Sequence, residues 1–401
     1  MKKVFFTIYD MGGGHRSTAN ALKEVIEQRN LPWQIEILEV FKEVFGTTTP
    51  QYLYNNFVLK KKWAKSINDP LSVPLFKLQI RLRHDAWRKR LQNYWRKHQP
   101  DLVVSLMPLV NKVLYESLRS ELPSTPFVTS ITDFADCPPN FWIEEQKQLL
   151  ICPSAKTIQQ AQDCGYSGNQ LFSTSGVVIH PRFNQIVNCD RILERQRLGL
   201  NPDLPTGLVI FGTQGSKEML EILERLEQSP LQLQLIFICG RNEKLANILR
   251  SRPSRIAKFV EGFTTQIPTY MHTSDFFIGK PGSVGISEAI AMKLPVITEC
   301  NNTTTLFQER ASADWLAENG FGIVVNNFSE IDKAVAQLIE PQNFVRYQAN
   351  VRAYNNRAAF EVVDILENIL GAPNGAGKGE GARALGIEAS IPKRRLESLK
   401  D

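Results

Sequence analysis

Apolar and polar positions along the chain follow one recurring order. A short apolar run rich in Val, Ile, Leu and Phe comes first, and a longer amphipathic segment follows it. Short apolar strands that alternate with helices predict a parallel sheet with helices on both faces. In the first half of the chain the pattern predicts strands at 4–9, 35–40, 101–106, 126–132 and 149–152, and helices at 17–28 and 110–119.

The same order begins again after residue 205. It predicts strands at 207–212, 233–239, 275–278, 295–298 and 322–325, and helices at 217–228, 287–292 and 328–338. We therefore expect an α/β protein with two Rossmann-like, doubly wound units that face a cleft. Ligands of such sheets bind beyond the carboxyl ends of the strands. The predicted boundaries are 1–182 for an N-terminal domain, 183–345 for a C-terminal domain, 346–370 for a long terminal helix and 371–401 for a flexible Gly-rich tail.

Composition limits the class of protein. Hydrophobic residues make up 43% of the 401 residues and charged residues 22%, which is typical of a soluble globular protein. No apolar run has the roughly 20 residues of a membrane-spanning helix. The first apolar run is interrupted by Thr7 and Asp10 and lacks a cleavage site, so we predict a strand rather than a signal peptide. The six cysteines form no CxxC pair, which indicates a reducing cytoplasm and argues against structural zinc.

The net charge of +6 is concentrated in one stretch. Residues 60–98 hold twelve Lys or Arg, with Trp63, Trp87 and Trp95 among the interleaved aromatics. Basic and aromatic residues together fit an anionic membrane surface or a nucleic acid. They fit equally well a solvated helix whose aromatic side chains face the core. The stretch alone does not choose between these interpretations.

A Gly-Gly-Gly-His sequence follows the first predicted strand. It is not a GxGxxG motif, and no acidic residue stands at the usual position for a dinucleotide ribose. Gly13 and Gly14 allow a ligand to approach the backbone closely, just before a helix begins. His15 has an unperturbed pKa near 6.5 and suits a general base for a hydroxyl group. A loop histidine that bonds local backbone is the alternative.

Two Gly-rich turns in the second half are weaker signals. The first, Phe211–Ser216, leads from a strand to a helix and could hold a diphosphate through its backbone N–H groups. It lacks the GK[ST] ending of a nucleoside-triphosphatase loop, so ATP hydrolysis is not expected. The second places Arg241 just beyond a strand, where a guanidinium can pair with a phosphate. Either turn by itself could be an ordinary surface connection.

The strongest single motif is Gly279–Glu288. A strand ends in a Pro-Gly turn and a helix opens directly after it, so Gly282 and Ser283 can present N–H groups to a phosphate. Glu288 falls in that helix, and a carboxylate suits the two hydroxyls of a ribose because it only accepts hydrogen bonds. About twenty residues later, Gln308 and Glu309 combine an amide with a carboxylate, a pairing suited to sugar hydroxyls.

Taken together and in this order, the motifs resemble those of the monogalactosyldiacylglycerol synthase family and of its relative, the peptidoglycan N-acetylglucosaminyltransferase. Both are glycosyltransferases of the GT-B fold. The resemblance extends from about Lys3 to Gly322. It is densest in the following segments: 11–22, 131–142, 176–183, 211–216, 239–242, 261–297 and 307–310.

The resemblance implies a role for each matching position. The C-terminal unit would hold a UDP-sugar and the N-terminal unit would meet a lipid acceptor at an anionic membrane surface. The implied catalytic residues are His15 and Asp133. The implied donor-binding residues are Gly212, Thr213, Gln214, Gly215, Ser216, Arg241, Gly262, Phe263, Pro281, Gly282, Ser283, Glu288, Gln308 and Glu309. The implied acceptor or membrane residues are Gly13, Gly14, Trp63, Trp87, Arg88, Lys89 and Arg90.

The resulting hypothesis is an inverting hexosyltransferase that works peripherally at a membrane on the cytoplasmic side. We expect no cofactor besides the donor substrate, no nucleic-acid partner and no bound metal, since Asp133 and Asp136 have the wrong spacing for a DxD motif. The turn at Lys280–Gly285 departs from the family's usual KAGPGT, which leaves the sugar and the acceptor undecided. The alternatives are a UDP-sugar epimerase on the same fold and a non-catalytic protein that binds a membrane or nucleic acid.

Overall fold

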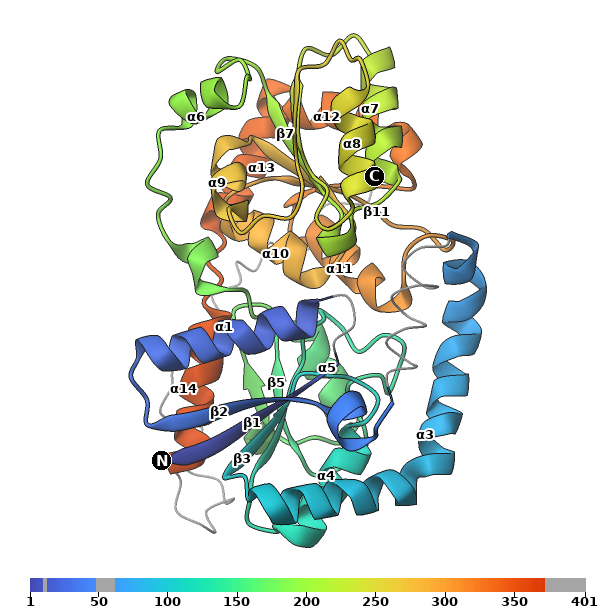
Figure 1. Cartoon of the computed structure of the whole chain (residues 1–401), viewed down its shortest axis with the longest axis vertical. Helices are drawn as coiled ribbons and strands as arrows, with labels where there is room; N and C mark the ends of the chain where they lie inside the picture. The colour runs from blue at the N-terminus through green and yellow to red at the C-terminus, as the bar shows by residue number, and fades with distance from the viewer. Residues whose placement is uncertain (10–12, 48–61, 372–401) are drawn as a thin grey trace, which may run out of the picture.

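The computed structural model describes residues 1–9, 13–47 and 62–371. These residues form two six-stranded sheets, one in each half of the chain, and every strand pairing in both sheets is parallel. Figure 1 shows the N-terminal unit below the C-terminal unit, each with helices on both faces of its sheet. The predicted pair of doubly wound units is therefore confirmed.

The N-terminal sheet has the strand order β2-β1-β3-β4-β5-β6. Its central strands are buried on both faces, which explains why they are continuous apolar runs rather than alternating ones. Phe5 and Phe6 of β1 are both fully buried although they point to opposite faces. The strands are β1 (Lys2–Ile8), β2 (Trp33–Glu39), β3 (Leu102–Ser105), β4 (Phe127–Ser130), β5 (Leu149–Cys152) and β6 (Leu171–Ser173).

Helices cover both faces of this sheet. One face packs against α1 and against α14 (Ala358–Gly371), which comes from the C-terminal end of the chain, and the other packs against α3 and α4. The helical segments are α1 (Gly14–Gln28), η1 (Val40–Val44), α3 (Lys62–His98), α4 (Asn111–Glu121), α5 (Ala155–Asp163), η3 (Gly168–Gln170) and η4 (Pro181–Asn184). Among the described residues, no helix is both long enough and apolar enough to cross a bilayer.

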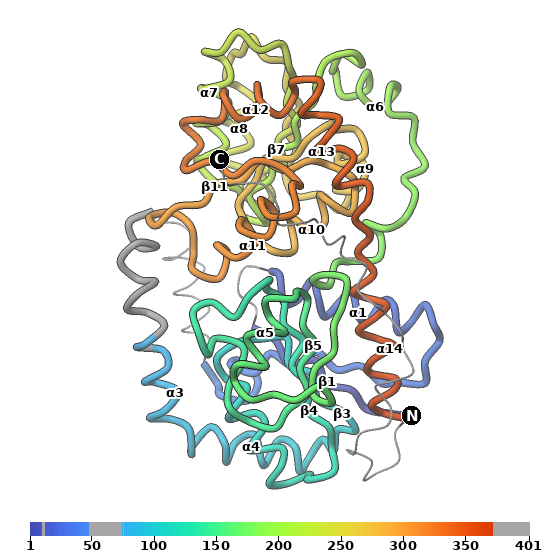
Figure 2. The backbone as a smooth tube through the Cα atoms, turned by 180° about the vertical axis from the view of Figure 1, so that it is seen from behind, coloured from blue at the N-terminus to red at the C-terminus, as the bar shows by residue number. Residues whose placement is uncertain are grey.

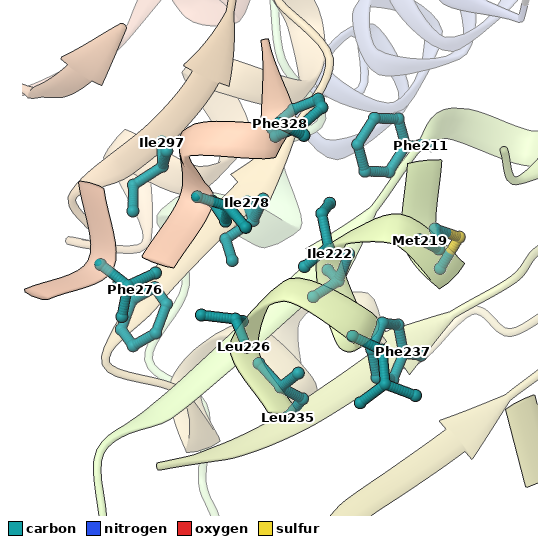
Figure 3. Packing of buried hydrophobic residues seen from close by; sticks show 14 of the residues in the cluster. Phe211, Met219, Ile222, Leu226, Leu235, Phe237, Phe276, Ile278, Ile297 and Phe328 are labelled. Atoms are coloured by element: carbon teal, nitrogen blue, oxygen red, sulfur yellow. The ribbon is translucent and has the colours of Figure 1, made fainter. Parts of the chain in front are cut away.

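The C-terminal sheet has the order β12-β11-β10-β7-β8-β9. Its main core lies between the sheet and helices α7, α8 and α12, and Figure 3 shows part of it, with Phe276, Phe237 and Phe328 packed among aliphatic side chains. The strands are β7 (Thr206–Ile210), β8 (Gln234–Ile238), β9 (Lys258–Glu261), β10 (Phe276–Gly279), β11 (Val296–Glu299) and β12 (Gly322–Val325). The helical segments of this unit are α6 (Arg191–Arg197), η5 (Gly212–Gln214), α7 (Glu218–Gln228), α8 (Glu243–Ser251), α9 (Ile267–Thr273), α10 (Ser283–Ala291), α11 (Phe307–Glu318), η6 (Phe328–Glu330), α12 (Ile331–Ile339) and α13 (Pro341–Ala353).

The prediction of one long helix over 346–370 is wrong, because α13 and α14 are separate helices. The break is stabilised by contacts with the connection between the two sheets. The Tyr354 hydroxyl donates to the Ser175 carbonyl at 2.6 Å, and the Asn356 side chain donates to the Val177 carbonyl at 3.0 Å. Asn356 also accepts a hydrogen bond from the N–H of Ala358 and so caps α14.

The two helices belong to different halves of the molecule. α13 packs on the C-terminal unit, whereas α14 crosses back and lies beside α1 on the N-terminal unit (Figures 1 and 2). Arg29 at the end of α1 pairs with Asp364 and Glu367 of α14. The chain therefore connects the two units twice, once through residues 174–190 and once between α13 and α14.

Candidate active site

Loops at the carboxyl ends of strands from both sheets meet between the two units. A Cβ placed on Gly13 would lie 3.8 Å from Thr213 Cγ2, and one placed on Gly14 would lie 3.9 Å from Val284 Cγ2. The loop before α1 therefore lies against both Gly-rich loops of the C-terminal unit. The sequence predicted that these motifs face one another, and the structure places them so close that a single added methyl group would fill the space between them.

A hydrogen bond and a ring stack also join the units at this point. The hydroxyl of Ser283, the first residue of α10, donates to the Thr132 carbonyl at 2.7 Å, and the same hydroxyl lies 3.2 Å from Asp133 Oδ1. Phe134 stacks on Trp315 of α11 with 3.9 Å between ring centroids. The hydroxyl of Ser283 thus contacts the N-terminal unit, so its predicted phosphate contact would have to come from its backbone N–H.

Asp133 is the carboxylate closest to this junction. It accepts a hydrogen bond from Trp142 Nε1 at 2.9 Å. Burial raises the pKa of Asp133 to about 6, and the hydrogen bonds from Trp142 and Ser283 oppose that shift. The charge of Glu309 also raises this pKa, and the charge of Lys280 lowers it. Groups of both units therefore influence the pKa of the Asp133 carboxyl group.

Asp136 has a structural role in the same loop. Its carboxylate accepts backbone hydrogen bonds from Asn140 at 2.8 Å, Phe141 at 2.9 Å and Trp142 at 2.6 Å. These bonds fold residues 136–143 into a compact turn and orient the Trp142 ring toward Asp133. Asp136 thus positions Trp142, the hydrogen-bond partner of Asp133. Its own carboxylate oxygens are occupied by backbone N–H groups.

His15 lies in the first turn of α1, between two aromatic rings. Its ring centroid is 6.1 Å from that of Tyr9 and 6.1 Å from that of Trp142. Burial lowers the pKa of His15 to about 4, and a hydrogen bond with the Tyr9 backbone opposes the shift. The imidazole is therefore neutral at physiological pH, which is the state that a proton acceptor needs.

The two weaker Gly-rich turns support each other. Gly240 has φ +58°, and a Cβ there would lie 2.3 Å from the Thr213 carbonyl oxygen, so only glycine fits. The Arg241 N–H donates to the same carbonyl at 2.8 Å. Gly215 has φ +58° as well, and a Cβ there would lie 2.8 Å from the Cys239 carbonyl oxygen. The turns after β7 and β8 are thereby fixed against each other.

Arg241 and Phe263 lie together beyond these turns. The guanidinium carbon of Arg241 is 5.2 Å from the centroid of the Phe263 ring, which is a cation–π distance. The Phe263 side chain is 57% exposed, which is unusual for a phenylalanine and leaves a ring face available. Gly262 is buried beside it, and a Cβ there would lie 2.5 Å from a Glu243 carboxylate oxygen.

The helix after the strongest motif starts earlier than predicted, at Ser283 rather than near Ser287. The first N–H groups of α10 therefore lie at the junction itself, where they favour an anion.

Glu288 lies further along the same helix. Burial raises the pKa of Glu288 to about 7, and the charge of Arg182 lowers it. Arg182, in η4, is a site residue that the sequence analysis did not select.

Lys280 is the second residue that the sequence analysis passed over. It pairs with Glu309 in the first turn of α11, and Gln308 precedes Glu309 in that turn. The Lys280 Cε atom would lie 3.8 Å from a Cβ on Gly212 and 3.4 Å from a Cβ on Gly282. A lysine directly after a strand that ends at the cleft was the available signal. The sequence analysis singled out the glycines of the Gly279–Glu288 motif and not this lysine.

Ser216, also predicted to bind the donor, uses its hydroxyl locally. That hydroxyl bonds the Glu218 carboxylate at the start of α7. Thr213 and Gln214 are exposed, and Pro281 is buried.

In the described part of the chain, no group of three or more His, Cys, Asp or Glu side chains could hold a metal ion.

The basic and aromatic stretch is helix α3, and the prediction for Trp87 is wrong. Its side chain is 6% exposed and stacks on Phe45 with 4.2 Å between centroids, so it belongs to the core. Trp95 is fully buried as well. The side chain of Trp63 lies outside the described residues. Aromatic rings at helical spacing face the sheet here, as the core interpretation of this stretch predicted.

The outer face of α3 has a different character. Leu78 is 50% exposed and Leu82 is 77% exposed, one helical turn apart. Lys89 is exposed and Arg88 is half-buried. Arg90 donates to the Phe45 carbonyl at 2.6 Å, so part of its role is to hold the end of η1.

The sequence was compared with known families and proteins. The family model "Monogalactosyldiacylglycerol (MGDG) synthase" matches residues 15–179. Monogalactosyldiacylglycerol synthase 1 of Arabidopsis thaliana is 27% identical over 392 residues, which cover 93% of this chain and 72% of that protein. The spinach (Spinacia oleracea) monogalactosyldiacylglycerol synthase is 28% identical over 388 residues, which cover 92% and 73%. Both relatives are chloroplastic.

The fold was compared with solved structures. MurG of Acinetobacter baumannii superposes with a TM-score of 0.60 and 14% identity, over 92% of this chain and 100% of that one. HepE of Anabaena in complex with UDP superposes with a TM-score of 0.53 and 14% identity, over 92% and 99%. The likeness covers both sheets and shows that their arrangement is the GT-B fold.

Proposed function

Because this chain is a monogalactosyldiacylglycerol synthase-like glycosyltransferase of the GT-B fold, we propose that it transfers a hexose from a UDP-sugar to a hydroxyl of a lipid such as diacylglycerol. The transfer inverts the anomeric configuration and takes place at a membrane surface. The supporting observation is that two sets of groups meet where the units join. Gly13 and Gly14, next to His15, lie against the glycine loops, and Asp133 contacts Ser283 and senses the charge of Glu309.

The donor occupies the C-terminal unit in this proposal. The uracil lies at Gly262 and Phe263, whose exposed ring offers a stacking face. The ribose hydroxyls bind Glu288, and the diphosphate binds the first N–H groups of α10 and the turn after β7. The Glu309 carboxylate then accepts hydrogen bonds from sugar hydroxyls, and the Gln308 amide both donates and accepts them. The relatives' names include a galactolipid synthase. Contacts with individual sugar hydroxyls decide which hexose is used.

The reaction is a single displacement. The acceptor hydroxyl oxygen attacks the anomeric carbon, and the bond from that carbon to the β-phosphate oxygen breaks. His15 takes the hydroxyl proton, and UDP leaves with the electron pair of the broken bond. The low pKa of His15 means that its ring is unprotonated before the reaction. The α10 N-terminus stabilises the charge that develops on the departing phosphate.

The acceptor approaches from the N-terminal unit. We place its reacting hydroxyl beside His15, where Gly13 and Gly14 carry no side chain, and next to Asp133, which contacts Trp142 and Ser283. We assign the outer face of α3 to an anionic membrane surface. Leu78 and Leu82 insert among the lipids while neighbouring basic side chains meet the headgroups.

Lipid analysis of a host that expresses the gene tests this function. The account predicts a new hexosyl lipid by mass spectrometry with the wild-type protein and its loss with His15→Ala. The same lipid profile with and without the wild-type protein would contradict it. Conversion of the UDP-sugar into an isomer without release of UDP would instead support the epimerase.

A further inference from the structure

Lys280 and Glu309 form an ion pair in the middle of the proposed donor site. Lys280 follows β10, and Glu309 lies in the first turn of α11. The Glu309 side chain is only 10% exposed, whereas that of Lys280 is 39% exposed. A carboxylate this buried is costly without a charged or hydrogen-bonding partner, and Lys280 supplies that partner.

The lysine side chain also covers the backbone of both glycine loops. Its Cε atom would lie 3.8 Å from a Cβ on Gly212 and 3.4 Å from a Cβ on Gly282, and its Nζ atom 3.7 Å from the latter. The Glu309 Oε1 atom would lie 3.9 Å from that same Cβ on Gly282. The ammonium group therefore lies over the loops that face the diphosphate, beside the carboxylate that faces the sugar.

Arg241, the cation that the sequence selected for the phosphates, lies elsewhere. Its guanidinium is next to the ring of Phe263, at the end of the site proposed for uracil. The bond that breaks joins the sugar to the β-phosphate. Lys280, through its pairing with Glu309, is at the sugar end of the donor, where the charge of the leaving group develops.

We propose that the Lys280–Glu309 pair is a donor-responsive switch, in which the β-phosphate of a nucleoside-diphosphate sugar draws Lys280 away and releases Glu309 to the sugar. This inference rests on the proposed function. The pair occupies the site until a donor arrives, because the carboxylate stands in for the phosphate. UDP alone takes the lysine but leaves Glu309 buried without a partner, whereas a UDP-sugar supplies partners to both groups.

The proposed switch predicts that substitutions of Lys280 and of Glu309 change the affinity for UDP in opposite directions. Lys280→Gln removes a charged contact with the β-phosphate, so the affinity for UDP falls at least about tenfold while that for UMP is unchanged. Lys280→Arg keeps the charge and retains most of the affinity. Glu309→Gln removes the competitor for the lysine, so the affinity for UDP rises about threefold or more. Lys333→Gln, on an exposed position of α12, is the matched control.

Isothermal titration of UDP and UMP into these variants tests the switch, with thermal melting as the check that each variant is folded. Equal loss of UDP and UMP affinity in Lys280→Gln, or no loss at all, overturns the role of Lys280. An unchanged or weaker UDP affinity in folded Glu309→Gln overturns the competition. If the wild-type protein binds neither UDP nor a UDP-sugar, the proposed function itself fails, so the two failures are distinguishable.

Discussion

The hydroxyl of Ser283 donates a hydrogen bond to the carbonyl of Thr132 across 2.7 Å, and this bond joins the two units of the protein. Thr132 follows β4 of the N-terminal sheet, and Ser283 begins α10 of the C-terminal unit. Both residues are buried, with Ser283 8% and Thr132 4% exposed. A buried contact at this point fixes the spacing between the N-terminal unit and the loops of the C-terminal unit that we propose to bind the donor.

Removal of this bond should impair catalysis more than donor binding. Ser283→Ala leaves the Thr132 carbonyl without its partner, which costs about 1–3 kcal/mol of stability. We expect kcat/KM to fall about tenfold because the acceptor side shifts relative to the donor. UDP affinity should change little, since the backbone N–H groups of α10 remain.

Steady-state kinetics and urea unfolding measure these two effects. Ser251→Ala, at an exposed position at the end of α8, serves as the control because its hydroxyl bonds only its own helix. Wild-type kcat/KM in Ser283→Ala would show that the hydrogen bond does not set the geometry of the site.

The pH dependence of kcat/KM identifies the base. His15 has a pKa of about 4 because burial disfavours its charged form, so it is neutral and active from about pH 5 upward. Asp133 has a pKa of about 6, so a profile governed by Asp133 would rise between about pH 5 and 7. We expect no acidic limb near pH 6 in the wild-type protein. A limb near pH 6 that disappears in Asp133→Asn would make Asp133 the base instead.

The lowered pKa of His15 also affects stability. In the unfolded chain the pKa of His15 is near 6.5. Between about pH 6.5 and 4 the imidazole is therefore protonated in the unfolded state and neutral in the folded state. The free energy of unfolding should therefore decrease as pH falls through this window. His15→Gln should lose less stability than the wild-type protein over the same interval in urea unfolding curves. Parallel curves for the two proteins would contradict the buried, neutral imidazole.

UDP affinity should depend on pH through Glu288. Its pKa of about 7 means that the carboxylate is formed progressively between about pH 6 and 8. In our proposal this carboxylate accepts hydrogen bonds from both ribose hydroxyls. Affinity for UDP should rise over that interval. Glu288→Gln should bind UDP about tenfold more weakly at pH 8 and lose this part of the pH dependence. Titration calorimetry at three pH values distinguishes the outcomes, and wild-type affinity in Glu288→Gln would remove Glu288 from the donor site.

The outer face of α3 should control membrane binding. Replacement of Leu78 and Leu82 by Ser removes apolar surface that the membrane would bury, so partitioning to anionic vesicles should fall about tenfold or more. UDP affinity should not change. Val345→Ser, at an exposed position of α13, is the matched control. Unaltered vesicle sedimentation in the double variant would exclude this face as the membrane contact.

The sequence was sufficient to predict the two sheets because their central strands are buried on both faces and stand out as apolar runs. Strands β6 and β9 were missed, since both lie at sheet edges, where strands are short and half-exposed. The break between α13 and α14 also escaped prediction. It depends on Tyr354 and Asn356 bonding to residues about 180 positions earlier, a contact that no local pattern contains.

The candidate site was predictable in its loops but not in its pairs. Glycines and the strand-to-helix order identified the turns around Gly212 and Gly282. The contacts of Lys280 with Glu309 and of Ser283 with Thr132 join residues that are distant in the chain, so only the fold reveals them. Trp87 was assigned to the wrong environment, because an aromatic residue beside basic ones fits both a membrane surface and a core.

Reconstitution with defined components shows whether the protein transfers a sugar to a lipid. Purified protein is mixed with vesicles that contain diacylglycerol and an anionic lipid, together with UDP-galactose, UDP-glucose or UDP-N-acetylglucosamine in separate reactions. The account predicts that one donor yields a glycosyl diacylglycerol of inverted anomeric configuration, with one UDP released for each lipid formed and neither product made by His15→Ala. Donor turnover that is independent of the lipid, or no glycolipid from any of the three donors, would contradict it.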